Sequence, residues 1–550
     1  FLEQITTIKT PKDLMRYVAD QQKLQNNILF NMYVGSDEKN STKNILVLNQ
    51  GGLGLPDRDY YFKTDAATLA VVTAYKTYVT RLLTLTGEDS SVAFKKAGLI
   101  LDLEKSLATS HRTNVELRDP ESNYHKTAVA DFEIKAPAFG LKTFLDNIAV
   151  ETDSVNISQP AFYLKLNELL KSVPVETWQV YLRFHTLDHA AQNLSSDFVN
   201  ANFAYARALT GQQQIKPRWQ RMTASTDNHL GEALGELYVK KYFSEDAKKR
   251  MIDLVNNLQK AFEARIGKLD WMSDSTKTKA KEKLNTFIKK IGFPDKWRDY
   301  SAVKINKATY FENIESCAKN EFNYQIKKVG KDVDKTEWGM TPPTINAYYN
   351  PTFNEIVFPA GILQFPFFDE AADDAVNYGG IGMVIGHEMT HGFDDQGAQY
   401  DKDGNLKLWW SKEDYAKFQT RSDKEKAQYS SFTVLDSMHL NGGLTNGENI
   451  ADLGGITIAY DAFKLTKQGQ DTVKINGFTP DQRFFLSYAQ IWRGKQKDEV
   501  LRQQVNTNPH SPSEWRVNGP LMNFDPFYKA FNVQPGEKMY KPEAERIKIW

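Results

Sequence analysis

The chain has 550 residues, 41% hydrophobic and 12% aromatic, so it can build sizeable cores and is long enough for more than one of them. Lysine plus arginine and aspartate plus glutamate number 69 each, and this balance excludes the uniform charge that draws a protein to nucleic acid or to an anionic membrane. No apolar run reaches the roughly 18 residues that a bilayer-spanning helix needs, so the sequence predicts no transmembrane segment.

Residues up to about 305 show mainly helical patterning, with no internal repeat and no low-complexity segment. In the clearest stretch, apolar residues recur at i, i+3, i+4, i+7 and i+11, which predicts one buried stripe along an amphipathic helix. The stripe consists of Met251, Leu254, Val255, Leu258 and Phe262. His185 and His189 are four residues apart, but no glutamate follows His185, so we expect a surface or locally hydrogen-bonded pair and not a metal site.

Two later segments are rich in turn signals. Prolines break the helical pattern at residues 338–343, and the segments 344–349 and 355–358, separated by an Asn-Pro pair, are typical of a β-hairpin. Residues 401–405 read Asp-Lys-Asp-Gly-Asn and resemble a calcium-binding loop, but they lack its third acidic position and its closing glutamate. We therefore expect a hairpin turn at this second segment.

Residues 387–391 read His-Glu-Met-Thr-His, which is the spacing of a zinc peptidase motif. Residues four apart share one face of a helix, so His387 and His391 can direct their imidazole nitrogens at one ion. Neutral imidazoles suit Zn²⁺, and a catalytic zinc keeps one of its four positions for water, which Glu388 could reach from the next position on the helix. Three glycines before the motif leave room for close helix packing: Gly379, Gly380 and Gly382.

A third ligand is predicted by a second pair of residues four apart, Glu448 and Asp452, which follows a glycine-rich segment at 442–447. One carboxylate would complete a site of two histidines and one glutamate. The other could hydrogen-bond the outer nitrogen of a metal-bound imidazole, most simply that of His387, and so fix its tautomer. Alone, this pair would be interpreted as a solvated helix face, but beside the first motif it indicates a metal site.

The two motifs and several longer stretches resemble the neprilysin and endothelin-converting-enzyme family of zinc metallopeptidases, and among its members the bacterial oligopeptidase O type. The stretches that carry this resemblance are 52–61, 217–219, 233–239, 269–272, 346–351, 358–364, 386–392, 447–455 and 518–523. They span nearly the whole chain.

The resemblance implies a zinc-dependent endopeptidase that acts on oligopeptides and holds one Zn²⁺ per chain. The ligands would be His387, His391 and Glu448, with Asp452 behind one imidazole. Glu388 would take a proton from the attacking water and pass one to the leaving amine. His510 matches the family's transition-state histidine, a donor to the oxyanion that develops on the carbonyl.

The resemblance also assigns substrate-binding residues. Asn346 and Ala347 match the pair that binds the peptide backbone, as expected where a peptide adds to the edge of a sheet. Arg516 matches the arginine that holds a substrate carbonyl past the cut. The positions that line the pocket for the residue after the cleaved bond are all apolar here, which implies cleavage on the amino side of large hydrophobic residues. They are Ile362, Phe367, Met383, Val384, Ile491 and Trp492.

The family fold is mainly α, with two helical lobes around a cavity, a thermolysin-like zinc site in one lobe and a small β-hairpin or sheet at that site. We therefore expect residues 1–305 to form mainly the lobe that covers the cavity. Residues 306–550 would form the catalytic lobe, which could recruit N-terminal pieces. Such an enclosure would admit flexible peptides and exclude folded proteins.

The chain departs from the family pattern in two places. Lys548 stands where many members have arginine. The family's first segment, with an arginine that grips the far end of the peptide, has no counterpart, so we expect that part as a removed, disordered or separately chained fragment. Cys317 is alone and the disulfides of animal members are absent, which favours a bacterial protein. We favour a periplasmic, secreted or cell-surface location, with the cytoplasm as the alternative.

Two other functions compete with a peptidase. A binding or adhesion protein could keep the fold without activity, but a decayed site would have lost a member of the set of catalytic and ligand residues, which is intact. A zinc hydrolase of non-peptide substrates is the other alternative, and the Asn346 hairpin argues against it.

Overall fold

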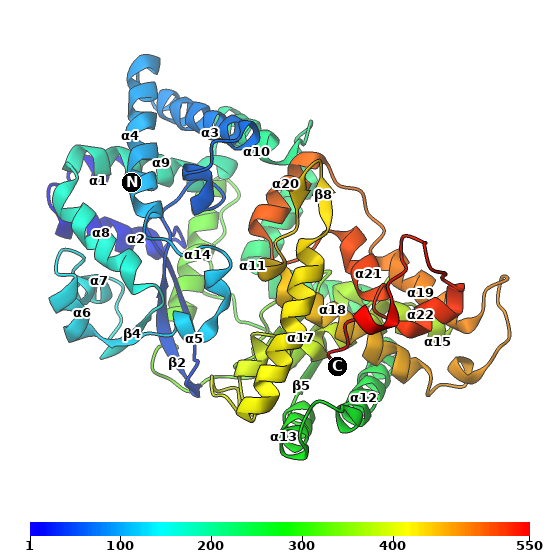
Figure 1. Ribbon diagram of the computed structural model, residues 1–550. Coiled ribbons are helices and arrows are strands. Elements are labelled where there is room, and N and C mark those ends of the chain that lie inside the picture. Colours follow the sequence, from blue (N-terminus) through cyan, green and yellow to red (C-terminus); the bar gives the residue numbers. More distant parts are fainter. The chain divides into compact units, whose positions relative to one another are not determined.

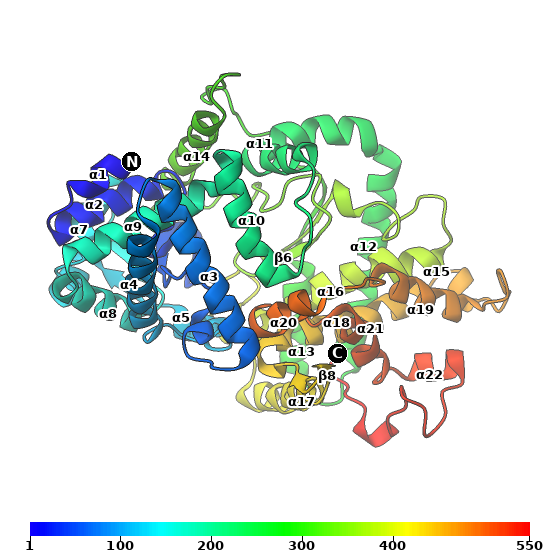
Figure 2. The same cartoon turned by 90° about the horizontal axis from the view of Figure 1, so that it is seen from above.

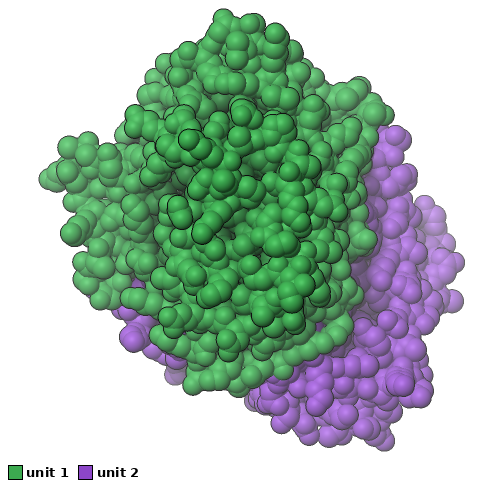
Figure 3. Space-filling view, turned by 90° about the vertical axis from the view of Figure 1, so that its left-hand side faces the viewer, with its two compact units in different colours: residues 1–225, 299–333 green, residues 226–298, 334–550 purple.

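The computed structural model describes residues 1–550, which are mainly helical with three small sheets (Figure 1). The chain divides into two compact units, coloured in Figure 3: the first comprises residues 1–225 and 299–333, and the second 226–298 and 334–550. This division differs from the single boundary near residue 305, because the chain enters the second unit early and then returns to the first. No helix combines the length and the apolar character that crossing a bilayer requires.

The first unit packs its helices and a four-stranded sheet around one apolar core. Its helices are α1 (Leu2–Thr6), α2 (Pro11–Gln22), α3 (Ala66–Leu85), α4 (Ser90–Ala108), α5 (Pro120–Asn123), α6 (Val129–Lys135), α7 (Leu141–Asn147), α8 (Pro160–Ser172), α9 (Val175–Ala190), α10 (Ser196–Thr210) and α14 (Tyr310–Ile326). Its strands are β1 (Asn31–Asp37), β2 (Asn40–Asn49), β3 (Lys126–Ala128) and β4 (Ser154–Ile157), in the order β1-β2-β4-β3. Only the β2–β4 pair is parallel.

A buried carboxylate in the first unit accounts for His185. Glu104 on α4 is fully buried, and its oxygens accept hydrogen bonds from the hydroxyls of Tyr61 and Tyr75. The Nε2 atom of His185, on α9, lies 2.9 Å from Glu104 Oε1. Helices α3, α4 and α9 pack side by side around this group (Figure 2). His185 therefore belongs to a hydrogen-bonded core network.

Helix α11 (Arg218–Tyr242) carries the chain into the second unit, with a break in its helical backbone at Leu230. The helices that follow there are α12 (Glu245–Lys268), α13 (Asp274–Asn285), α15 (Asp374–Asn377), α16 (Met383–His391), α17 (Lys412–Ser430), α18 (Gly442–Phe463), α19 (Pro480–Ile491), α20 (Asp498–Thr507), α21 (Ser513–Leu521) and α22 (Asp525–Phe531). All five apolar residues of the predicted stripe are buried on α12, which confirms that prediction. Because this stripe packs against α16 and α18, α12 belongs with the second unit.

A three-stranded sheet lies beside α16. Its strands are β5 (Ile288–Gly292), β6 (Tyr348–Asn350) and β7 (Glu355–Pro359), in the order β5-β7-β6. The predicted hairpin is confirmed as the antiparallel pair β6–β7, although its first strand begins at Tyr348 and not at residue 344. A further hairpin joins β8 (Thr433–Leu435) to β9 (Met438–His439). Since β6 is an edge strand and packs against α16, it brings an unpaired sheet edge close to the zinc motif.

The turn at residues 401–405 is a hairpin turn, as predicted. The Asp401 carboxylate accepts hydrogen bonds from the backbone N–H groups of Asp403 and Asn405, and Gly404 has a φ of +85°. Tyr400 pairs with Leu406 on the two sides of the turn. The aspartate thus satisfies the turn's own backbone, a common role for this residue type.

Candidate metal centre

Glycine residues let helices α16 and α18 approach closely (Figure 2). A Cβ atom added at Gly386 would lie 2.6 Å from the Gly455 carbonyl oxygen, and one at Gly455 would lie 2.8 Å from the His387 nitrogen. A π-helical turn at Tyr378–Gly382 precedes α16, and a Cβ at Gly379 would lie 2.1 Å from the Phe484 carbonyl oxygen. Two helix backbones in direct contact bring side chains of both helices to one point.

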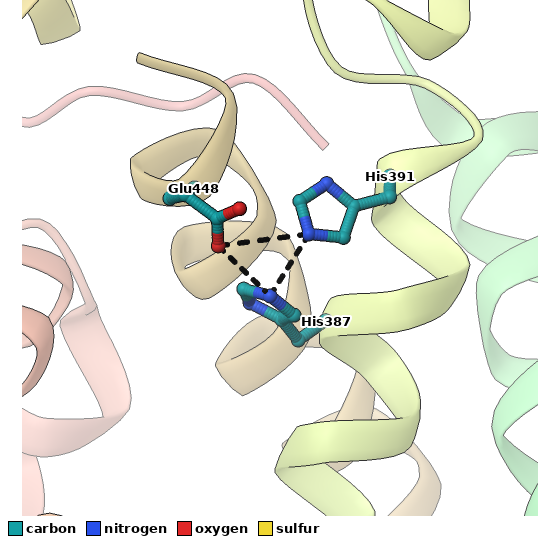
Figure 4. A group of neighbouring side chains, drawn as sticks. All are labelled: His387, His391 and Glu448. Carbon is teal, nitrogen blue, oxygen red and sulfur yellow. Dashed lines mark hydrogen bonds and ion pairs between the residues drawn. The ribbon is translucent and has the colours of Figure 1, made fainter. Parts of the chain in front are cut away.

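Three side chains meet at that point. His387 and His391 extend from α16 and Glu448 from α18, and their donor atoms face one another (Figure 4). The two Nε2 atoms are 3.0 Å apart, and Glu448 Oε2 lies 3.3 Å from that of His387 and 3.7 Å from that of His391. The cluster is nearly closed to solvent, because its side chains are at most 17% exposed.

The outer nitrogens of both imidazoles are held by carboxylates. His387 Nδ1 lies 2.8 Å from Asp452 Oδ1, and His391 Nδ1 lies 2.7 Å from Asp394 Oδ2. Since a carboxylate accepts, each Nδ1 carries the proton, and a neutral ring then presents its Nε2 lone pair to the cluster. Asp394 was not predicted from the sequence, although its position three residues after His391 could have indicated it.

The donor set fits a cation. Two Nε2 lone pairs that face each other at 3.0 Å repel unless a positive ion lies between them. Glu448 Oε2 is buried and has no hydrogen-bond partner, although both imidazoles are near it. Two imidazole nitrogens and one carboxylate oxygen form the usual set of protein donors in a catalytic zinc site.

Burial and charge set the protonation of the cluster. Burial raises the pKa of Glu448, but the neighbouring imidazoles, that of His391 above all, outweigh it and hold the pKa well below its usual range. Burial and the charge of His391 lower the pKa of His387, but Asp452 and Glu448 raise it more, so the net shift is upward. Protons therefore compete with a cation for these nitrogens at low pH.

Glu388 is buried beside the two imidazoles, with 5% of its surface exposed. Burial raises its pKa, and the nearby imidazoles lower it only in part. A carboxylate with a raised pKa takes up a proton more readily than one in water, which is the property that a general base and acid needs.

Arg516 joins the cluster from α21. Its Nε and Nη2 atoms donate to the two oxygens of Asp452, at 2.8 and 2.7 Å, and Nη2 also lies 3.7 Å from Glu448 Oε2. The guanidinium lies over the Trp492 ring, 4.1 Å from its centroid. Burial raises the pKa of Asp452, but the Arg516 charge outweighs that effect and keeps the carboxylate ionised. Sequence reasoning placed Arg516 at the substrate but missed this ion pair.

His510 lies on the loop before α21, with its Nε2 atom 3.2 Å from Glu448 Oε2 and 45% of its side chain exposed. Its backbone N–H donates to Asn508 Oδ1, and its Nδ1 lies 2.9 Å from the same oxygen. The next residue, Ser511, is buried and donates to Asn449 Oδ1 at 2.8 Å. An imidazole edge open to solvent is thus held beside the carboxylate.

The predicted substrate-binding residues lie in two places. Asn346 is exposed and Ala347 is buried, and both come directly before the edge strand β6. The six apolar positions all belong to the core of the second unit or pack against it: Ile362, Met383 and Val384 are buried, and Phe367, Ile491 and Trp492 are partly buried. Lys548 lies apart from the cluster, and its Nζ contacts Asp525 Oδ2 at 3.1 Å.

Comparisons with known proteins point to one family over most of the chain. Models described as peptidase family M13 match residues 1–294 and 346–547. Endothelin-converting enzyme 1 of Homo sapiens is 37% identical over 543 residues, which cover 95% of this chain and 69% of that protein. An inhibitor complex of Mycobacterium tuberculosis zinc metalloprotease Zmp1 superposes with a TM-score of 0.97 at 38% identity, covering 100% of this chain and 84% of the other. PepO of Lactobacillus rhamnosis gives 0.92 at 28% identity, covering 100% and 86%.

Proposed function

Because this chain belongs to peptidase family M13 and is a zinc metalloendopeptidase, we propose that it hydrolyses oligopeptides on the amino side of large hydrophobic residues. We assign one Zn²⁺ to His387, His391 and Glu448, the group whose donor atoms converge. When bound, zinc supplies Lewis acidity, which polarises a carbonyl group and lowers the pKa of water.

The remaining steps are carried by side chains of the chain itself. Glu388 takes a proton from the attacking water and delivers one to the leaving amine, for which its buried position and raised pKa suit it. With a proton on each ring nitrogen, His510 donates from Nε2 to the oxygen that becomes negative in the transition state, and its partly exposed edge is open to a peptide. Asp452 keeps the His387 ring in one orientation.

The peptide backbone would bind along β6. A peptide that adds to this edge strand gains main-chain hydrogen bonds, and Asn346 and Ala347 continue the strand toward its N-terminal side. Arg516 would hold a substrate carbonyl beyond the cut. A guanidinium has five N–H donors, and its fork onto Asp452 uses two of them.

The observation that supports the hydrophobic preference is the Trp492 ring, which lies under the Arg516 guanidinium and so next to Asp452 and Glu448. Ile491 precedes it, and Val384 lies one turn before His387. Apolar side chains near the zinc ligands favour a large apolar residue just after the cleaved bond.

A mixed peptide library, incubated with and without chelator and analysed by mass spectrometry, tests this proposal. We expect chelator-sensitive cuts before Phe, Leu and similar residues, and we expect Trp492→Ala to weaken that preference. Leu486→Ala on α19, the helix that ends just before Trp492, is the matched control and should cut like wild type, because this side chain is 42% exposed. Cuts mainly after basic residues would overturn the preference.

The source is also part of the proposal. Two of the similar solved structures are bacterial, and the single Cys317 of this chain leaves no intrachain disulfide, so we favour a bacterial oligopeptidase. A separately chained N-terminal fragment stays a prediction.

A further inference from the structure

A buried lysine lies at the C-terminal end of α16, the helix that carries His387 and His391. Lys283, near the end of α13, is 1% exposed, and its Nζ donates to the carbonyl oxygens of Gly392, Gly397 and Tyr400, each at 2.7 Å. An ammonium group has three N–H donors, which matches three acceptors, whereas a neutral amine has two. Burial lowers the pKa of Lys283 and the charges of Asp394 and Asp401 offset this only in part, which leaves the pKa at about 7. Only the charged ammonium form of Lys283 has an N–H group for each of the three carbonyl oxygens.

The three carbonyls belong to one loop, residues 392–400, which begins where α16 ends. Gly392 is the C-terminal cap of α16, directly after His391. The last carbonyl groups of a helix lack intrahelical donors and form the negative end of the helix dipole. A buried cation at this place is therefore stabilised by hydrogen bonds to these carbonyls and by the dipole. The loop folds back on the helix end, because a Cβ at Gly397 would lie 1.8 Å from the His391 carbonyl oxygen.

The same loop presents the carboxylate that holds His391. Asp394 Oδ2 lies 2.7 Å from His391 Nδ1, while Oδ1 accepts from the backbone N–H groups of Gln396 and Gly397. Gly397 thus donates to Asp394 through its N–H and accepts from Lys283 through its carbonyl. The lysine and the aspartate are connected through a single residue.

Aromatic rings enclose the ammonium. Its nitrogen lies 5.6 Å from the Phe393 ring centroid, 5.9 Å from that of Trp409 and 6.0 Å from that of Tyr349. Asn354 ties the same end of α13 to the turn that follows the loop, because its Nδ2 donates to the Lys283 carbonyl and to that of Lys402. Water cannot readily replace the lysine in such surroundings, so its loss would leave three carbonyls unsatisfied.

We propose that Lys283 is a positioning residue of the metal centre, whose buried ammonium closes the 392–400 loop and thereby holds Asp394 against His391. This inference rests on the assignment of His391 as a zinc ligand. Outer partners of a metal ligand typically change metal affinity or activity roughly 10- to 100-fold when they are lost. The lysine acts through Asp394 and touches neither substrate nor ion.

Zinc affinity of the purified full chain, measured by competition with a chromophoric chelator, tests the inference. We expect Lys283→Met to weaken zinc binding about tenfold, the low end of the range for outer partners, with little change in the KM of the zinc-loaded enzyme. Lys279→Met is the matched control. Lys279 lies one turn earlier on α13 and donates to the Trp409 carbonyl, which is outside the loop. Unchanged zinc affinity in Lys283→Met would overturn the proposal.

Thermal unfolding with and without zinc separates positioning from general stability. A purely structural lysine would lower the melting temperature of both forms equally, and the increment that zinc adds would stay as in wild type. A positioning lysine reduces that increment. Should Lys283→Met not fold, Lys283→Gln serves instead, because its amide keeps two N–H donors but no charge, and the same two outcomes apply.

Glu448→Ala distinguishes failure of this inference from failure of the ligand assignment. If Glu448→Ala keeps full zinc occupancy, the assigned site itself is wrong. If Glu448→Ala loses zinc while both Lys283 variants bind it like wild type, the assignment of the zinc ligands is retained and only the positioning role of Lys283 is rejected.

Discussion

Each of the two histidines assigned to zinc has its outer ring nitrogen in contact with a buried carboxylate. Asp452 contacts His387, and Asp394 contacts His391. The carboxylates differ in their own support: Arg516 pairs with Asp452 through two hydrogen bonds, whereas Asp394 accepts from loop backbone N–H groups. Each ring therefore has one tautomer and one orientation before any ion binds.

At the residue scale, Glu388→Gln separates metal binding from proton transfer. Glutamine has nearly the same size but cannot take up the proton, so we expect kcat to fall roughly 10²- to 10⁴-fold, the contribution of a positioned acid–base group. Zinc content, measured by elemental analysis, should stay at one ion per chain. A variant that keeps a substantial part of the wild-type kcat would show that another group is the base.

A second residue-scale prediction concerns His510. Its replacement by alanine removes a donor beside the cluster, and kcat should fall roughly 10²- to 10³-fold while zinc content stays unchanged. His439→Ala, which replaces an exposed histidine on β9, is the control and should retain wild-type kinetics. If His510→Ala raised only KM, the side chain would bind substrate without stabilising the transition state.

At the scale of elements, α18 supplies Glu448, the adjacent buried amide of Asn449 and, one turn on, Asp452. Asn449 is fully buried, accepts from Ser511 and donates to Thr445 one turn earlier. It therefore links the loop of His510 to the helix of Glu448. A loop position that depends on one buried amide can be tested by removing that amide.

We expect Asn449→Ala to lower kcat roughly 10- to 100-fold, because a small displacement of a catalytic group is costly, and to leave zinc binding intact. Ser511→Ala should act through the same hydrogen bond, so the double variant should resemble either single variant and the effects should not add. Steady-state kinetics of the three variants measure this. Fully additive effects would show that the two residues act independently.

The junction of α13 and α17 carries a pH-dependent contact. Asp414 accepts from the backbone N–H and the hydroxyl of Ser273, at 3.0 and 2.5 Å. Burial raises its pKa, but hydrogen bonds from Ser273, Thr276 and Ser411 outweigh that and lower the pKa below its ordinary value of 3.8. The contact therefore stabilises the fold above roughly pH 4 and is lost as the pH falls toward the folded-state pKa.

Asp414→Asn should consequently destabilise the chain near neutral pH and lose this disadvantage as the pH is lowered below about 4. Urea unfolding of the zinc-free protein, followed by tryptophan fluorescence at a series of pH values, gives the difference in unfolding free energy. Asp274→Asn is the control, because this side chain is fully exposed one residue after Ser273. A difference that stays constant with pH would contradict the assignment.

At the scale of the whole molecule, the two units have separate apolar cores, and all residues of the metal centre belong to the second. Zinc held by the three assigned ligands would stabilise the folded second unit by mass action. Chelation should increase hydrogen exchange in α16, α18 and the 392–400 loop, while β2 and β4 of the first unit keep their protection. Exchange measured by mass spectrometry with and without chelator checks this. Equal loss of protection in both units would contradict it.

The sequence by itself determined the features that depend on local spacing. Residues four apart share a helical face, which brought together His387 with His391 and identified the buried stripe of α12. Residue types that favour turns predicted the hairpin β6–β7 and the turn at residues 401–405. The resemblance of long motifs then led to the family, which the comparisons confirm.

Only the tertiary structure decided which partners meet across long separations in the chain. Lys283 and the Gly392 carbonyl are 109 residues apart, Arg516 and Asp452 are 64, and Ser511 and Asn449 are 62. For the same reason, the sequence could not predict how the chain divides into two units, 1–225 with 299–333 and 226–298 with 334–550. Periodicity shows which face of a helix is buried, but it carries no information on which distant element covers that face.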